Sequence, residues 1–152
     1  MRGVYTAQIP IASISGAKTL LVLRAPSNAV AEVLSASISN NNNDTPEQLE
    51  AGLFKITNIA SIAGTAVTPT KHEPLDGASV CGSSGNLSAE PSSYDSDAID
   101  RQGWNNLAGY RYDPIPEERP IVGPTGAIGL RILGTIDTAF SGVAQIVYRE
   151  IG

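Results

Sequence analysis

The residues best suited to acid–base or metal chemistry surround the only histidine of the chain. His72 stands beside Glu73, and Asp76 follows three residues after that glutamate. Imidazole and carboxylate groups bind zinc and transfer protons, but a zinc site or a catalytic triad needs three or four converging groups. Because the histidine lies between Pro69 and Pro74, we expect a solvated loop here. We predict no catalytic residue and no enzyme activity.

A second group of carboxylates, Asp95, Asp97 and Asp100, lies in the string DSDAID. Alternate carboxylates in a loop can converge on a calcium ion. The string lacks the glycine and the final bidentate glutamate of an EF-hand loop. These aspartates are therefore a weak calcium candidate, and the alternative is exposed acids at the start of a strand. We expect no cofactor.

Two glycine patterns imitate known motifs without matching them. Gly123, Gly126 and Gly129 recur every three residues, but the dinucleotide fingerprint has another spacing and opens a helix, whereas a strand is predicted to follow here. We expect these glycines to form a hairpin turn. The string GSSG at 82–85 does not have the glycine spacing of a hydrolase nucleophile elbow.

Four aromatic residues fall close together in the sequence: Tyr94, Trp104, Tyr110 and Tyr112. Aromatic rings fill cores, anchor protein interfaces and stack on sugars. Core packing, a protein interface, and a glycan platform built from Trp104, Tyr110 and Tyr112 therefore remain open.

The composition indicates one domain, residues 1–152, with few charges. Asp, Glu, Lys and Arg make up 16% of the chain and the net charge is -5, whereas globular proteins average about 25% charged residues. No basic footprint for nucleic acid is present. The run LLVL at 20–23 is too short to cross a membrane, and the first residues do not resemble a secretion signal. Such a surface suits burial against another protein, although a solvated Ser/Thr-rich face is the alternative.

Short segments of alternating polar and apolar residues, each ended by Gly, Pro, Asn or Ser, predict the fold class. We predict an all-β, single-domain antiparallel sandwich of jelly-roll type with eight or nine strands, or else a generic Greek-key sandwich. The expected strands cover residues 3–13, 19–25, 29–39, 52–61, 66–68, 97–104, 107–112, 126–134 and 142–151.

Several details of these strands are also predicted. Pro10 lacks a ladder donor, which indicates an edge strand or a bulge. The segment 19–25 is apolar on both faces and should be central. In the third strand Val30, Leu34, Ala36 and Ile38 should share one face, opposite Val33, Ser35, Ser37 and Ser39. Phe54 and Ile56 should point inward.

The connecting segments follow from their turn-forming residues. We expect exposed loops at 40–48 and in the Ser-rich segment 81–97, and a long connection between the sheets at 64–77. Thr45 and Pro46 could start one helical turn. Asn105 and Asn106 suit the tight turn of a hairpin between the strands that flank them.

Several stretches resemble a family of small virion proteins. They are GTAVTP (64–69), EPLDG (73–77), Trp104, GYRYDPIPEERPIV (109–122) and YREIG (148–152). The chain from about Phe54 to its end is similar to the capsid decoration, or cement, proteins of tailed bacteriophages. The Ser-rich segment 81–96 departs from that pattern.

The resemblance implies a trimeric β-sandwich on the outside of a phage head. The implied partners are the major capsid protein and further copies of the chain, without nucleic acid or membrane. The protein would be made in the host cytoplasm and would end on the capsid exterior. We predict an interface that includes Trp104, Tyr110, Tyr112, Glu117, Glu118 and Arg119. The alternative function is a carbohydrate-binding module or a receptor-binding fibre head.

Overall fold

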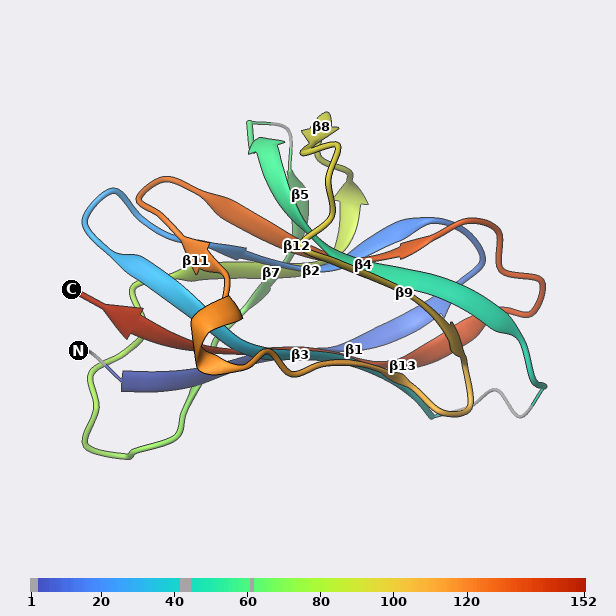
Figure 1. The fold of residues 1–152 in the computed structure, drawn as a ribbon, viewed down its shortest axis with the longest axis horizontal. Coiled ribbons are helices and arrows are strands. Elements are labelled where there is room, and N and C mark those ends of the chain that lie inside the picture. Colours follow the sequence, from blue (N-terminus) through green and yellow to red (C-terminus); the bar gives the residue numbers. More distant parts are fainter. Residues whose placement is uncertain (1–2, 42–44, 61) are drawn as a thin grey trace.

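A computed structural model describes residues 3–41, 45–60 and 62–152 of the chain. Thirteen strands form two antiparallel sheets that pack face to face (Figure 1). Sheet A contains β1 (Gly3–Ile14), β3 (Val30–Asn40), β6 (Thr70–Lys71), β10 (Tyr110–Tyr112), β11 (Ile121–Val122) and β13 (Phe140–Ile151). Sheet B contains β2 (Lys18–Arg24), β4 (Gln48–Asn58), β5 (Ala63–Val67), β7 (Gly82–Ala89), β8 (Ser93–Tyr94), β9 (Asp100–Asn105) and β12 (Ala127–Leu133).

The order of the strands is that of a jelly roll. Sheet A runs β10-β3-β13-β1-β6, and sheet B runs β5-β7-β2-β12-β4-β8, with β9 also paired to β4. The chain passes from one sheet to the other between β1, β2, β3 and β4, and again between β9, β10, β12 and β13, as a double Greek key does. The all-β sandwich is therefore confirmed. Of the four strands that were not predicted, β6, β8 and β11 have only two residues each, and β7 is the fourth.

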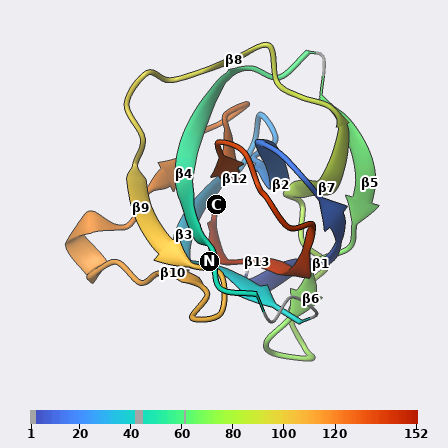
Figure 2. The same cartoon turned by 90° about the vertical axis from the view of Figure 1, so that its right-hand side faces the viewer.

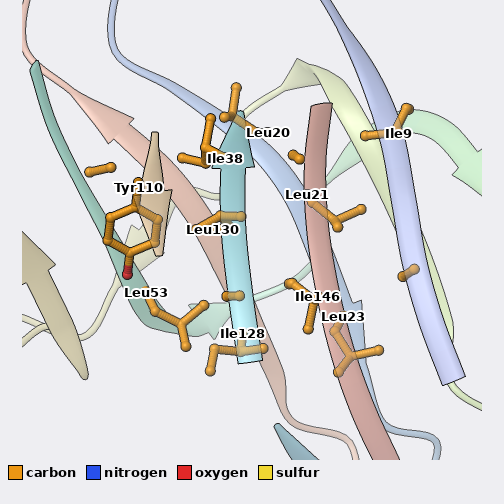
Figure 3. Close-up of a cluster of buried hydrophobic side chains, with 14 of the residues drawn as sticks. Ile9, Leu20, Leu21, Leu23, Ile38, Leu53, Tyr110, Ile128, Leu130 and Ile146 are labelled. Carbon is orange, nitrogen blue, oxygen red and sulfur yellow. The ribbon is translucent and has the colours of Figure 1, made fainter. Parts of the chain in front are cut away.

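One apolar core fills the space between the two sheets. Side chains from both sheets point toward one another, among them Leu21, Leu53 and Leu130 of sheet B and Ile38 and Ile146 of sheet A (Figure 3). All five are no more than 1% exposed. Burying each such side chain stabilises the fold by about 1.5 to 3 kcal/mol.

The edge and centre positions agree with the prediction. β1 pairs with β13 along its length, whereas β6 covers only Tyr5 and Thr6 on its other side, so Pro10 lies on an open edge. The pairing of β1 with β13 is irregular between Ile11 and Ile14. β2 lies between β7 and β12 and is buried on both faces.

The predicted faces of β3 are wrong in part, because the strand contains a bulge. The register between β3 and β13 shifts at Leu34, so the inward positions change from odd to even numbers there. Val33 is buried before the bulge, and Ala36 and Ile38 are buried after it. Val30 and Leu34 are only partly buried and do not share that face.

The predicted orientation of Phe54 and Ile56 is also wrong. The inward residues of β4 are Leu49, Ala51 and Leu53. Phe54 and Ile56 lie on the opposite face, where Ile56 packs with Val22, Leu87 and Ala127 in a second cluster covered by Ile59, Ile62 and Tyr94. Both faces of β4 are apolar at this end, so alternation by itself could not select the inward one.

The Ser-rich segment is not a loop throughout, because residues 82–89 form β7 between β2 and β5. Small side chains are required there. A Cβ atom on Gly85 would lie 2.7 Å from a methyl carbon of Ile9 and 2.8 Å from the carbonyl oxygen of Leu20. This close approach explains a strand of Ser and Gly that propensity disfavours.

Two further local predictions are wrong. No helical turn forms after Pro46, because residues 48–58 pair as β4 with β9 and β12. Among the described residues a 3-10 turn lies instead at η1 (Pro116–Glu118). Asn105 and Asn106 do not close a hairpin, because β9 and β10 belong to different sheets. Instead the buried Asn106 accepts a hydrogen bond from the Glu47 amide at 3.0 Å and donates one to the Thr45 carbonyl at 2.9 Å. Residues 42–44 of the predicted 40–48 loop lie outside the described residues, as does Ser61.

Candidate functional site

The outer face of sheet A carries three rows of uncharged side chains on three adjacent strands. The register of β1, β13 and β3 places them opposite one another as Pro10–Val143–Ser39, Gln8–Gln145–Ser37 and Thr6–Val147–Ser35. All nine are exposed or partly exposed. We call these nine residues the uncharged face. It points away from sheet B, downward in Figure 1.

Charged groups lie at the borders of the uncharged face, and some of them are paired. On one border the Arg111 guanidinium forms an exposed ion pair with Asp113. These two residues, Ser35, Ser37 and Gln145 line a shallow groove of about 260 Å³. Burying a neutral side chain costs less desolvation free energy than burying a charged one. The centre of the face can therefore be covered by a partner at small cost.

A nearly buried carboxylate, Glu32, closes one end of the face and joins two of the motifs described in the sequence analysis. Glu32 accepts hydrogen bonds from Arg149 and lies 3.5 Å from the Arg119 guanidinium. Arg119 belongs to the PEER stretch and Arg149 to the terminal YREIG. These motifs therefore meet in space, and Glu32 holds the segment around η1 against sheet A.

The outer face of sheet B differs, because segments of the chain cover it. Glu90 accepts hydrogen bonds from the Thr19 amide at 3.0 Å and the Thr19 hydroxyl at 2.5 Å, and from the Tyr94 hydroxyl at 3.0 Å. The Arg131 guanidinium lies 4.3 Å from the centre of the Tyr94 ring. These contacts hold β8 over the second apolar cluster. Sheet A is thus the sheet whose outer face offers a broad surface to a partner.

The Tyr94 phenol predicts how stability depends on alkaline pH. Burial raises the pKa of Tyr94 to about 12, against a lowering by the Thr19 hydrogen bond and a further rise from Glu90. Between pH 10 and 12 the unfolded chain loses this proton and the folded chain keeps it, so stability falls as pH rises. We expect Tyr94 to account for about 1 kcal/mol of that fall, discounted because the ring is half-exposed. Urea unfolding at pH 9 and pH 11 measures the fall, and Tyr94→Phe should reduce its steepness.

The loop between β6 and β7, residues 72–81, projects beyond the sandwich near the two chain termini (Figure 1). Two buried side chains fasten it. The Tyr5 hydroxyl donates to the Gly77 carbonyl at 3.0 Å. One carboxylate oxygen of Glu150, Oε1, accepts from the Ser79 hydroxyl at 2.5 Å, the Val80 amide at 2.9 Å and the Cys81 amide at 3.0 Å. The loop is therefore held in one shape at its base.

The predicted acid–base group does not come together as a site. His72 Nε2 lies 2.7 Å from the Thr6 hydroxyl, and the Glu73 side chain accepts from the Leu75 amide within its own turn. Glu73 is exposed and Asp76 is partly buried. These contacts shape the loop.

The three aspartates that were weak calcium candidates likewise do not converge on one point. Asp100 accepts from the Tyr110 hydroxyl at 2.6 Å and from the side-chain Nε2 of Gln102 at 2.8 Å. Asp95 accepts a long bond from the backbone amide of Asp97. Across residues 3–41, 45–60 and 62–152, no three His, Cys, Asp or Glu side chains gather in an arrangement able to hold a metal ion.

The predicted interface residues divide between the core and the surface. Trp104 packs edge-on against Phe140 with ring centres 5.9 Å apart, and Tyr110 is 2% exposed (Figure 3). Neither ring is available to a sugar or a partner, so the proposed aromatic platform of Trp104, Tyr110 and Tyr112 does not exist in this fold. Of the remaining interface residues Glu117 and Glu118 are exposed, and Tyr112 and Arg119 are partly buried.

The glycine patterns have structural explanations. The Gly126 amide donates to the Gly123 carbonyl at 2.9 Å, closing a turn in which Thr125 has a φ of 60°. This turn joins β11 of sheet A to β12 of sheet B, so it connects the sheets and is not the predicted hairpin. The GSSG string lies within β7.

Some residues of this region were missed by sequence reasoning. The uncharged face depends on the register of three strands distant in sequence, and the sequence signal was limited to the alternation of Ser35, Ser37 and Ser39. Glu32 and Glu150 had no signal beyond an acidic residue within an apolar strand, which is rare unless the charge is paired.

Comparison of the chain with family models, with curated proteins and with solved structures gave no match. The described part of the chain also has no helix with the length and apolar character needed to cross a bilayer.

Proposed function

We propose that this chain is a structural protein of a tailed-bacteriophage virion, a capsid decoration protein that forms trimers and binds the outer surface of the head. The uncharged face of sheet A is the observation that carries the proposal. Nine neutral side chains in register, with the Arg111–Asp113 ion pair at one border, form a broad surface that can be buried against protein at small desolvation cost.

The structure and the sequence resemblance support the proposal from different sides. A jelly roll is common among viral coat proteins, although fold by itself does not establish function. The motifs that resemble the decoration proteins include PEER and YREIG, and their arginines meet at Glu32 beside the uncharged face. In this proposal the partner of the uncharged face is the major capsid protein.

A stable protein–protein contact needs a large buried area, which repeated copies of one face can supply. Specific interfaces bury about 1,200 to 2,000 Å² in total. A trimer presents three copies of the same face to the shell, and many attachment points strengthen binding without further sequence. We expect the protein to bridge neighbouring capsid subunits in this way.

Electron microscopy of gold-labelled protein mixed with heads built from the major capsid protein of the same phage tests the proposal. We expect label on the outside of the heads at regular positions. Gln145→Arg places a charge at the centre of the uncharged face and should weaken binding at least about 10-fold, because the charge must be desolvated. Ser88→Arg, at an exposed position of β7, is the matched control and should bind like the original protein. Absence of label from the heads, or binding that Gln145→Arg leaves unchanged, contradicts the proposal.

A further inference from the structure

One arginine on the outer face of sheet B has no partner for its charge. The other described arginines each contact a carboxylate or an aromatic ring: Arg101, Arg111, Arg119, Arg131 and Arg149. Arg24, at the end of β2, forms no ion pair within the described part of the chain. Its Nη2 donates one long hydrogen bond, 3.4 Å, to the Ile62 carbonyl, and its Nε is buried without a partner. A guanidinium has five donors, so most of those of Arg24 are unused.

Arg24 forms one wall of a hollow in that face. Strand register places Arg24 of β2 opposite Gly82 of β7, and Ser84 of β7 opposite Ala66 of β5. These three adjacent strands lie on the right-hand side of Figure 2. A Cβ atom on Gly82 would meet no atom within 4 Å, so the space beside Arg24 is open. The hollow has a volume of about 330 Å³, and we call it the Arg24 hollow.

The charge in the Arg24 hollow favours a carboxylate as ligand. Of the described residues that line it, Arg24 alone is charged. One guanidinium balances one negative charge, and its planar fork matches the two oxygens of a carboxylate. The chain has a net charge of -5, which disfavours a more highly charged anion. Partial burial of an unpaired cation costs desolvation free energy, and a bound carboxylate would offset that cost.

The uncharged lining determines what else the ligand must carry. Ile62, Ala63 and Ala66 contribute apolar surface next to the guanidinium, which suits a short aliphatic tail. The Ser84 hydroxyl lines the same hollow and is a further donor for the carboxylate. A volume of about 330 Å³ is at the small end of ligand pockets, so the tail must be short.

We infer that the Arg24 hollow binds an aliphatic carboxylate, with the Arg24 guanidinium as the anion-binding group. Butyrate is a ligand of this kind, and its carbon chain matches the side chain of glutamate. A free acid and a glutamate side chain of another protein therefore offer the hollow the same chemistry. This inference goes beyond the proposed function and does not depend on capsid binding or on self-association, because the hollow lies on sheet B and the uncharged face on sheet A.

NMR titration of isotope-labelled protein with butyrate tests the inference. We expect saturable shifts of amide signals that are confined to residues 24, 62–66 and 82–84. Butyramide has the same shape without the charge and should bind at least about 10-fold more weakly, because it cannot pair with the guanidinium. Inorganic phosphate should also bind more weakly than butyrate, because it has no aliphatic tail to contact the apolar lining.

Two variants with matched controls assign the binding to the hollow. Arg24→Gln removes the charge and should weaken butyrate binding at least about 10-fold, whereas Arg101→Gln removes an exposed guanidinium of β9 and should leave binding unchanged. Gly82→Val fills the hollow without changing any charge and should have an effect as large as Arg24→Gln. Its control is Gly16→Val, at a turn glycine that also has free space around a Cβ atom. An unchanged melting temperature shows that each variant folds, and Ser84→Val replaces Gly82→Val if the latter does not.

A blocked glutamate, N-acetyl-glutamate α-amide, distinguishes the two sources of the carboxylate. Binding of this compound as tight as that of butyrate supports a glutamate side chain of another protein, and binding of butyrate alone supports a free acid. The inference is overturned if neither carboxylate gives a saturable shift, or if butyramide or phosphate binds as tightly as butyrate. It is also overturned if butyrate binding survives Arg24→Gln.

Discussion

Replacing Glu150 by Ala should destabilise the protein by about 3 to 5 kcal/mol, because it leaves the buried Cys81 amide and the partly buried Val80 amide without an acceptor. Glu150 is 0% exposed, and its Oε1 accepts from the Val80 and Cys81 amides and the Ser79 hydroxyl. Each unsatisfied buried donor costs about 1 to 3 kcal/mol. Urea unfolding monitored by circular dichroism measures the loss.

Two variants show whether this effect comes from the buried site. Glu150→Gln keeps an acceptor in the same place and should lose less than Glu150→Ala. Glu50→Ala removes a carboxylate whose partner, Arg101, is 58% exposed, so it should change stability by no more than about 1 kcal/mol. Equal losses for Glu150→Ala and Glu50→Ala would mean that the 79–81 segment is not fastened by Glu150.

Replacing Trp104 by Ala should cost about 3 to 5 kcal/mol, since it empties a large volume in the core. Trp104 is 6% exposed and packs edge-on against Phe140, with an angle of 83° between the rings. A shift of the thermal midpoint by many degrees is expected. Tyr112→Ala, at a partly buried ring near the surface, should have a clearly smaller effect.

The same pair of variants separates core packing from glycan binding. A sugar platform needs exposed rings, so its loss would abolish binding on a glycan array without a comparable loss of stability. A Trp104→Ala protein that melts like the original but no longer binds a glycan would overturn the core assignment and restore the carbohydrate-binding alternative.

The uncharged face of sheet A lies across β1, β3 and β13, whereas the 72–81 loop projects beyond one end of the sandwich. Seen from the opposite end, the loop leaves the body near β6 at the side of sheet A (Figure 2).

The sequence predicted the class of fold because strand periodicity is a local property. The alternating segments at 3–13 and 142–151 each form a strand at nearly those residues, since every second side chain must face the same side. Pro10 predicted its edge position for an equally local reason, the missing amide donor. Prediction was wrong where a neighbour distant in sequence decides the outcome.

Bulges, strand pairing and burial are features that residues distant in the sequence decide. The bulge at Leu34 changes which side chains of β3 point inward, and it exists only through pairing with β13. The Ser-rich β7 forms because β2 and β5 supply its ladder partners, which outweighs its weak propensity. Trp104 and Tyr110 were as compatible with a surface as with a core until the two sheets enclosed them.

By itself the sequence determined a charge-poor chain of short alternating strands, and therefore an all-β sandwich. Only the tertiary structure decided that Gln8, Ser37 and Gln145 stand side by side, that Arg119 and Arg149 meet at Glu32, and that Glu150 fastens the 79–81 segment. The physical reason is the distance along the chain over which each effect acts. Periodicity acts between near neighbours in the chain, whereas register, burial and ion pairing join residues that only the packed sheets bring together.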